Sequence, residues 1–468
     1  MKEKKLARSN MKSASRSRKI AYTLASLVFI LLLTIMFGFS FNFVDRQSFS
    51  ESEKRELAKF PEFSFATLFN GDYFDGINLW FADTFPFRDA FVESSANIKK
   101  FLGIGQTIHN FSENNGDDIP EMQEESQSIV DISPVVPEQQ QQDDNLLKPA
   151  LPSGGTDIVQ NAGQGGDGAV LEQTISSIFV HGNTGYEYYN FVRGTADKYI
   201  NAINSAADAA ASNSINFYNM IIPTSIDITL NETSRSKLNS SDQKEAINYM
   251  HGSMNGNVKK VLIYDLLKAH SSEYLYYRTD HHWTSLAAYY AYAQFMTVKG
   301  TAYKPLSEFT QYTFPDFLGS FYSDTGKSSA LSVPDTVYAY VPPYDISFSM
   351  MQKGSSSYTQ WPLISDATTY SSSYKYLCFI GGDNPVSLIE NNSMESGETC
   401  VLVKESFGNP FAPYLSCNYK YVYVIDYRYF TGDITDFAKE KGATDIIVQN
   451  NISMTRNASL VEKLSQAL

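Results

Sequence analysis

Beyond residue 173 the chain alternates between short apolar runs and segments with a helical spacing of apolar residues. Residues 190–211 have helical spacing and end in alanine-rich sequence, and residues 215–223 then predict a buried strand. Residues 261–267 predict a strand followed by a turn. A helix is predicted over residues 285–298, with Thr284 as its cap. Three more strands, separated by helix-length pieces, are predicted over residues 400–404, 421–425 and 445–449.

This alternation of strands and helices favours an α/β fold with a mostly parallel sheet. Parallel strands need crossover connections, and the helix-length pieces between the strands supply them. The chain shows no internal repeat.

The amino terminus has a different pattern. Eight basic residues among the first 19 precede an uncharged, mostly apolar run over residues 20–44. Since about 20 residues in a helix cross the hydrocarbon core of a bilayer, this run predicts a single transmembrane anchor. The basic tail, residues 1–19, should then stay in the cytoplasm, with the rest of the chain outside the cell membrane. A cleaved signal peptide is the alternative, although its apolar region usually has about 7–15 residues.

Between the anchor and residue 173 the composition changes twice. Residues 46–112 are rich in aromatic and charged residues. They are too few to form a stable domain of their own, so we expect them to form the amino-terminal part of the α/β domain. Residues 113–172 contain four consecutive glutamines, many Asp, Glu, Gly and Pro residues and few aromatics. Such a segment cannot bury enough apolar surface to offset the ordering entropy. It predicts a disordered low-complexity insertion before the main domain, residues 173–468.

Charge and cysteine content restrict the class of protein. The chain has 37 Lys and Arg against 51 Asp and Glu. Without the eight basic residues and the one acidic residue of the tail, 29 basic and 50 acidic residues remain, a net charge of about −21. This charge argues against nucleic acid as a partner. Cys378, Cys400 and Cys417 are too few for a disulfide framework, and are either buried apolar residues or include one bridge.

Two of the six histidines stand beside a carboxylate in the sequence Asp280-His281-His282-Trp283. In an extended chain the side chains of Asp280 and His282 would share one face, with His281 on the other. This spacing suits a carboxylate that orients an imidazole base. It suits a metal site less well, because adjacent histidines diverge and no further cluster of ligands follows. Trp283 is interpreted as a packing residue, with a sugar-stacking platform as the alternative.

Ser406 follows the strand predicted over residues 400–404 and precedes Phe407, Gly408 and the apparent start of a helix. The carboxyl ends of parallel strands are where α/β sheets place their reactive groups, and N–H groups of the next turn can stabilise an oxyanion. A serine in this place is commonly a cap or a turn residue. Together with Asp280 and His282, however, it completes what a hydroxyl nucleophile needs, which is a base and a group that orients the base.

The residues around these side chains resemble the DHHW protein family, a bacterial membrane-anchored group. This family is similar to the SGNH-hydrolase-like proteins of alginate O-acetylation. The resemblance covers nearly the whole chain except the anchor and the insertion. The segments that carry it are residues 279–284 (TDHHWT), 287–290, 404–414, 424–430, 55–61 and 83–88.

The resemblance implies an SGNH-hydrolase-like three-layer sandwich with a mostly parallel sheet. It also implies that Ser406 is the nucleophile, His282 the general base and Asp280 the acid that orients it. Glu405 stands where Asp is commoner in the family. No GDSL block is present, so the oxyanion hole of ordinary SGNH esterases cannot be transferred. Asn409 and the backbone N–H of Ser406 are the candidates for that role.

Two neighbouring features keep alternative interpretations. Arg428 follows a predicted strand and either orients substrate or carboxylates, or forms a structural ion pair with Asp426 or Asp433. The glycine-containing segment at residues 381–385 has the chemistry of a tight turn, with a wall of the site as the alternative.

The leading hypothesis is a membrane-anchored, extracytoplasmic serine acyltransferase or esterase that adds acetyl groups to, or removes them from, a cell-surface or secreted polysaccharide. Acetyl-CoA is absent outside the cell, so the resemblance implies a polytopic membrane acyltransferase as the partner that supplies acetyl groups. No cofactor and no metal are predicted. One alternative is a non-catalytic cell-envelope protein that binds glycan. A phosphoesterase would need several separated aspartates to hold metals, and this pattern is not found.

Overall fold

The computed structural model describes residues 49–50, 55–56, 60, 80, 116–122, 127–132, 172–175, 177–355 and 357–468. The chain divides into two units, Met1–Gly105 and Gln106–Leu468. In the first unit, β1 (Phe49–Ser50) pairs antiparallel with β2 (Arg55–Glu56), and the ring of Phe60 meets that of Trp80 edge-on at 4.8 Å. The place of residues 46–112 in the α/β domain stays a prediction.

The predicted tail and anchor, residues 1–44, lie outside the described residues. In the part of the chain that the structure describes, no helix combines the length and the apolar character needed to span a bilayer.

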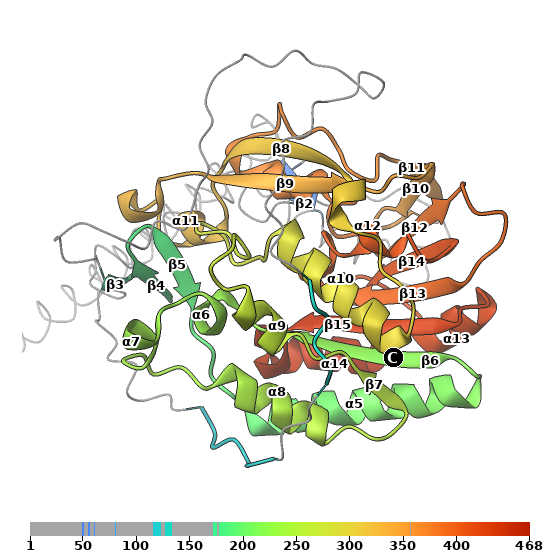
Figure 1. Ribbon diagram of the computed structural model, residues 1–468, viewed down its shortest axis with the longest axis horizontal. Coiled ribbons are helices and arrows are strands. Elements are labelled where there is room, and N and C mark those ends of the chain that lie inside the picture. Colours follow the sequence, from blue (N-terminus) through green and yellow to red (C-terminus); the bar gives the residue numbers. More distant parts are fainter. Residues whose placement is uncertain are drawn as a thin grey trace, which may run out of the picture. The chain divides into compact units, whose positions relative to one another are not determined.

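An eight-stranded sheet forms the centre of the second unit, in the order β11-β10-β12-β14-β13-β15-β6-β7 (Figure 1). The strands β14, β13, β15, β6 and β7 run parallel, while β12, β10 and β11 pair antiparallel at one end. The predicted mostly parallel sheet is therefore confirmed. Its strands are β6 Asn216–Ile222, β7 Val258–Lys260, β10 Ile346–Met351, β11 Tyr358–Gln360, β12 Val386–Asn391, β13 Thr399–Lys404, β14 Tyr421–Asp426 and β15 Asp445–Asn451.

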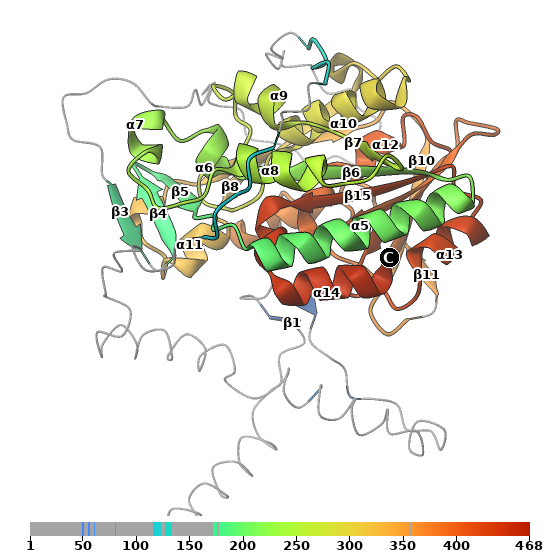
Figure 2. The ribbon, with the colours of Figure 1, turned by 90° about the horizontal axis from the view of Figure 1, so that it is seen from below.

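Helices cover both faces of this sheet and make three layers (Figure 2). Alternate residues of the central strands enter different cores: on β13, Cys400 and Leu402 pack on one side, and Val401 and Val403 on the other. One core contains residues of α9 Tyr264–Ala269, α10 Ser285–Lys299 and α12 Ala412–Leu415. The opposite core contains residues of α5 Arg193–Ser212, α8 Gln243–Gly252, α13 Ile434–Glu440 and α14 Ala458–Ala467.

The helix α10 places the histidine pair on this scaffold. The Thr284 side chain accepts from the Ala287 N–H at its start, as predicted, and Gly300 ends it in a left-handed conformation at φ 79°. Every residue from Ser285 to Met296 is buried, so the helix is fixed on all sides. The residues just before it, including His282, therefore lead directly into a well-packed helix.

Smaller elements surround the main sheet. β3 Glu172–Ile175, β4 Ile178–His181 and β5 Thr184–Glu187 form one antiparallel sheet, and β8 Thr310–Phe317 and β9 Asp335–Val341 form a second. The remaining short elements are α6 Ser225–Ile228, α7 Glu232–Arg235, α11 Ser320–Asp324, η1 Leu306–Glu308, η2 Ser329–Leu331, η3 Ser372–Cys378, η4 Ser406–Gly408 and η5 Ile452–Arg456.

Two predictions need correction. The strand predicted over residues 261–267 is wrong, because β7 ends at Lys260 and Tyr264 starts the helix α9. A short apolar run fits a buried strand and a buried helix equally well. Residues 116–122 and 127–132 also depart from the predicted disorder, because they are hydrogen-bonded to the α/β unit. The Gln127 side chain donates to the Lys260 carbonyl and accepts from the Leu262 N–H, and Ile132 enters the core.

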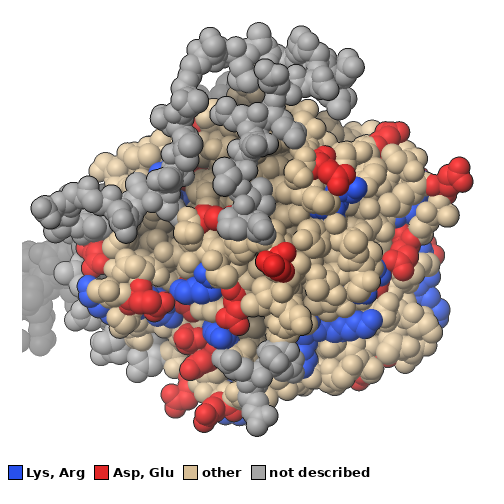
Figure 3. Space-filling model, in the orientation of Figure 1, with Lys and Arg blue, Asp and Glu red and all other residues tan. Residues whose placement is uncertain are grey.

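The three cysteines are buried and free, so they behave as apolar residues and form no bridge. On the described part of the face in Figure 3, acidic and basic side chains are scattered and neither sign forms one continuous patch.

Candidate active site

A tight turn joins Asp280 to His282. Oδ1 of Asp280 accepts from the backbone N–H of His282 at 2.9 Å and lies 2.6 Å from Nδ1 of its ring. The bond to the backbone two residues on is the typical bond of an Asx-turn. The predicted pairing of Asp280 and His282 is therefore present, but its geometry corrects the extended chain that we expected. Because the backbone bends here, the rings of His281 and His282 lie side by side, with centroids 3.9 Å apart.

The Asp280 carboxylate is buried and held from its far side. Its Oδ2 accepts from the Ser320 N–H at 2.7 Å, at the start of α11. The preceding Gly319 leaves the room for this approach, since a Cβ there would lie 2.2 Å from the Asp280 side chain. Thr279 is fixed in turn by Asp335, whose Oδ2 accepts from both its N–H and its hydroxyl. Neither carboxylate oxygen of Asp280 is left to move freely.

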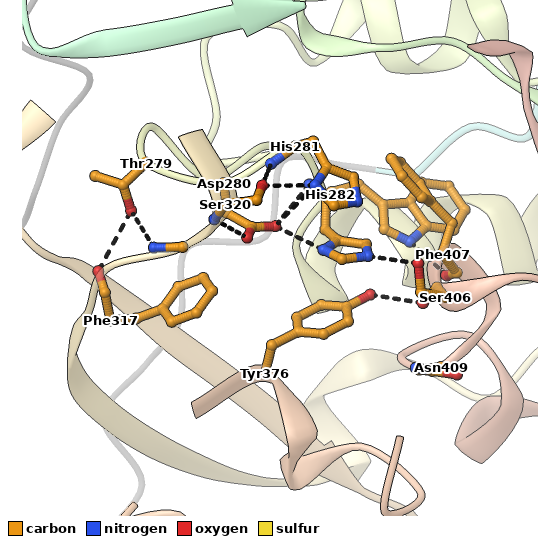
Figure 4. A network of polar contacts seen from close by, with 12 residues as sticks. Thr279, Asp280, His281, His282, Phe317, Ser320, Tyr376, Ser406, Phe407 and Asn409 are labelled. Atoms are coloured by element: carbon orange, nitrogen blue, oxygen red, sulfur yellow. Dashed lines mark hydrogen bonds and ion pairs between the residues drawn. The ribbon is translucent and has the colours of Figure 1, made fainter. Parts of the chain in front are cut away.

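Ser406 lies directly beyond the carboxyl end of β13. Its Oγ is 2.8 Å from Nε2 of His282 (Figure 4). A carboxylate only accepts hydrogen bonds, so the proton of the neutral His282 ring is on Nδ1, and Nε2 is left to accept the Ser406 proton. The structure thus brings together all three residues of the predicted set, although the histidine and the serine are 124 positions apart in the sequence.

Glu405 shapes the turn that carries Ser406. Its two carboxylate oxygens accept from the N–H groups of Phe407, at 3.0 Å, and Asn451, at 2.7 Å. The side chain therefore ties the end of β13 to the end of β15. Burial raises the pKa of Glu405 above its ordinary value, against the opposing effects of Arg428 and of these hydrogen bonds. Because the Phe407 N–H is engaged by Glu405, it is not available to an oxyanion.

An aromatic side chain fixes the plane of the His282 ring. The ring of Tyr376, from η3, stacks on that of His282 with centroids 4.0 Å apart, and its hydroxyl donates to the carbonyl of Ser406 at 2.9 Å (Figure 4). Burial raises the pKa of Tyr376 well above 10, so it acts as a neutral donor. Tyr376 therefore touches both the base and the nucleophile residue.

The two other residues of the histidine motif support the site. Trp283 is fully buried, and its indole N–H donates to the carbonyl of Phe407 at 2.8 Å. The packing interpretation of Trp283 is confirmed. His281 is partly exposed, with Nδ1 2.6 Å from Oγ of Ser320. Its contacts hold the segment that leads into α11, next to the Asp280 carboxylate.

Asn409 and Arg428, the two predicted oxyanion or substrate residues, meet at one carboxylate. Asn409 is buried and donates from Nδ2 to Oδ1 of Asp383 at 3.1 Å. Arg428 donates to Oδ2 of Asp383 at 2.7 Å and to both carboxylate oxygens of Asp426. The interpretation of Arg428 as a structural ion pair is supported, with Asp383 and not Asp433 as the second partner.

The sequence matches the family described as DHHW protein over residues 53–425. The chain belongs to the DHHW family. Its α/β unit is similar to that of a DHHW family protein from Eubacterium siraeum DSM 15702, with 26% sequence identity and a TM-score of 0.57, over 64% of this chain and 97% of that one.

Two other solved structures are similar at lower identity. For PatB1 of Bacillus cereus the identity is 16% and the TM-score 0.49, over 62% of this chain and 96% of that one. For the O-acetyltransferase domain of Pseudomonas putida AlgJ the identity is 11% and the TM-score 0.34, over 62% of this chain and 97% of that one. No curated protein matches the sequence.

In this DHHW protein, Asp280, His281 and His282 each offer a ligand atom, all within 4.8 Å of one another. Both ring nitrogens of His282 already take part in short contacts, with Asp280 and with Ser406. A metal ion would have to replace them. The arrangement therefore fits a hydrogen-bonded relay better than a metal site.

Sequence reasoning missed Tyr376, Gly319, Ser320 and Asp335. Gly319 lies on a loop, Ser320 and Asp335 start short elements, and Tyr376 lies in the short helix η3, so no periodic pattern marks them. Asp383 stood in the segment interpreted as a turn, and only its contacts show that it reaches Asn409.

Proposed function

We propose that this DHHW protein is a serine acyltransferase or esterase that adds acetyl groups to, or removes them from, a cell-surface or secreted polysaccharide. One observation carries the proposal: Oγ of Ser406 lies 2.8 Å from Nε2 of His282, whose Nδ1 is bound by buried Asp280. A serine hydroxyl is a weak nucleophile unless a positioned base takes its proton. All three groups are in hydrogen-bonding positions for that task.

The reaction has two halves. Ser406 Oγ attacks the acyl carbonyl carbon while its proton passes to Nε2 of His282, and Asp280 stabilises the resulting imidazolium. The tetrahedral intermediate collapses, and the leaving oxygen takes the proton from His282. A sugar hydroxyl or water then gives its proton to His282 and attacks the acyl-serine, and the proton returns to Ser406 as the sugar ester or the free acid is released. Transfer and hydrolysis differ only in which hydroxyl enters.

The oxyanion would be stabilised by two donors. The backbone N–H of Ser406 has no acceptor among the described residues, and neither has the second N–H of the Asn409 amide. Two donors at such a position are typical of acyl-transfer sites.

The proposed setting is the outer face of the cell membrane. Residues 20–44 would anchor the chain, with the basic tail in the cytoplasm. A transferase in this place would receive acetyl groups from a polytopic membrane acyltransferase, because acetyl-CoA is not at hand there.

The test is mass spectrometry of the detergent-solubilised full chain after exposure to a chromogenic acetyl ester. We expect an acetyl adduct on Ser406, loss of ester turnover in Ser406→Ala, and transfer of the group to candidate glycans. Ser212→Ala, at the exposed end of α5, is the matched control and should keep full turnover. Full activity of Ser406→Ala would exclude the assignment. No adduct, together with retained binding to purified polysaccharide, would favour a non-catalytic glycan-binding protein.

A further inference from the structure

Four charged side chains form a closed network beside the candidate site. Lys404 Nζ donates to Asp383 at 2.9 Å and to Asp426 at 3.2 Å, and Arg428 binds the same two carboxylates. The Lys404 and Asp426 side chains are 1% and 0% exposed. Because the two cations and two anions balance, this network offers no net charge to a substrate. The ion pairs therefore fix the positions of these four side chains relative to one another.

The network is hydrogen-bonded to the site through Asn409. Oδ1 of Asp383, which accepts from Lys404, also accepts from Nδ2 of Asn409 at 3.1 Å. A carboxylate cannot donate, so the amide of Asn409 must turn its NH₂ group toward Asp383. Its Oδ1 is buried with no partner among the described residues. The orientation of Asn409 is thus set by Asp383.

A strained loop delivers Asp383 to this position. Ile380, Gly381 and Gly382 follow one another in the left-handed region, at φ 47°, 62° and 84°. That conformation is uncommon for a β-branched residue such as isoleucine, and strained backbone of this kind gathers at functional sites. A Cβ at Gly381 would lie 3.1 Å from both Met350 Sδ and Trp361 Nε1, so the loop is closely packed. This loop leads directly into Asp383.

We propose that Asp383 is a positioning residue that fixes the Asn409 amide as an oxyanion donor, an inference that rests on the proposed function. One N–H of Asn409 binds Asp383, and the other stays available to the developing charge. Burial raises the pKa of Asp383, but the charges of Lys404 and Arg428 outweigh this effect and hold it well below its ordinary value. The carboxylate therefore stays ionised, and the Asn409 amide keeps one orientation.

An asparagine at position 383 would remove this control. It presents a donor and an acceptor, so it would no longer dictate which way the Asn409 amide faces, and it would leave one cation of the network without its balance. The Asp383→Glu substitution keeps the charge but displaces the carboxylate by one methylene. Both variants therefore disturb the amide, and the glutamate variant does so without loss of charge balance.

The experiment measures two rates on the detergent-solubilised full chain: labelling of Ser406 by a fluorophosphonate, and kcat on a chromogenic acetyl ester. Asn409→Ala should lower kcat by about 10²–10³-fold, as for removal of one oxyanion donor. Asp383→Asn should lower it by about 10²-fold, the usual effect of a misplaced group, with KM nearly unchanged. In the double variant, Asp383→Asn should add no loss beyond that of Asn409→Ala.

The matched control is Asp445→Asn. It breaks another buried ion pair, with Lys299 at 2.7 Å, but at the amino end of β15, the opposite edge of the sheet from Ser406. It should lower the melting temperature and leave kcat unchanged. If Asp383→Asn fails to fold, Asp383→Glu replaces it, with the same expected loss of kcat.

The outcomes separate the two proposals. Unchanged kcat in folded Asp383 variants, or an equal further loss in the Asn409→Ala background, would overturn the positioning role while the proposed function stood. If the unmodified chain is not labelled at Ser406, the proposed function fails and this inference fails with it.

Discussion

One oxygen of Asp280 binds His282 twice, through its backbone N–H and through Nδ1 of its ring. The bond to the backbone N–H fixes the position of the His282 backbone, and the bond to Nδ1 fixes which ring nitrogen carries the proton. Both depend on an oxygen that only accepts.

We expect Asp280→Asn to lower kcat by about 10⁴-fold, as loss of the correct tautomer does in Ser-His-Asp triads. An asparagine whose oxygen keeps the Ser320 N–H turns its NH₂ group toward His282, so the ring proton moves to Nε2 and the His282 N–H loses its acceptor. The measurement is ester turnover, together with the unfolding midpoint. Asp366→Asn, a change of an exposed carboxylate that bonds to Thr368 in its own loop, should keep full turnover. Full activity of Asp280→Asn would contradict the proposed relay.

Gly319→Ala should damage the site by displacing Asp280. The added Cβ would lie 2.2 Å from the Asp280 side chain, and that carboxylate cannot retreat because it is bound on both sides. We expect a loss of at least about 1–3 kcal/mol of unfolding free energy, as for overpacking, and a marked fall in kcat. Gly194→Ala is the matched control. Its Cβ meets nothing within 4 Å in the first turn of α5, and it should stabilise the chain slightly.

The parts of the fold that were predicted correctly have strong local signals. The strands β6, β13, β14 and β15 are apolar runs because both their faces are covered, and α10 begins at a capping threonine. The strand β11 could not be found this way, because all three of its residues are exposed. β10 was not predicted, because its apolar residues alternate with serines and form no continuous apolar run, although such alternation is itself a strand signal. β10 is held by its pairing with β12, a contact distant in sequence, and β11 by its pairing with β10.

The residues of the site also divide into those that have a local sequence signal and those that have none. Asp280, His282 and Ser406 were identified because the motif and the end of a predicted strand mark them. Tyr376 carries no such mark, since its role arises only when η3 folds over the His282 ring. The extended geometry expected around His281 was wrong because the Asp280 side chain bonds to the backbone and bends the chain. The bond from the Asp280 side chain favours a turn over an extended backbone, and the spacing of the residues alone does not reveal this local effect.

Removal of metal ions should leave ester turnover unchanged. Nδ1 of His282 lies 2.6 Å from Asp280 and its Nε2 lies 2.8 Å from Ser406, so neither nitrogen is spare for a ligand bond. The measurement is turnover before and after dialysis against a chelator, followed by addition of zinc or manganese. Loss of activity on chelation and its return with metal would revive a metal-dependent hydrolase, with Asp280, His281 and His282 as the ligands to test.

The buried histidine of α8 should make stability depend on pH. His251 is fully buried, with Nε2 3.0 Å from Oδ1 of Asn219, and burial with the nearby charge of Lys260 lowers its pKa to about 3. Above pH 6.5 the ring is neutral in both the folded and the unfolded chain, and its contribution does not change. Below pH 6.5 the unfolded chain takes up a proton that the folded chain refuses. The free energy of unfolding therefore falls by about 1.4 kcal/mol per pH unit between 6.5 and 3.

His251→Gln removes this titration while its side-chain amide can still donate to Asn219. We compare urea unfolding of each chain at pH 5.5 with its own value at pH 7.5, so that any fixed packing cost of the substitution cancels. The unmodified chain should lose about 1.4 kcal/mol more than the variant over this interval. Equal acid losses in the two chains would show that the folded state accepts a proton at His251, and that the ring is not held neutral by burial.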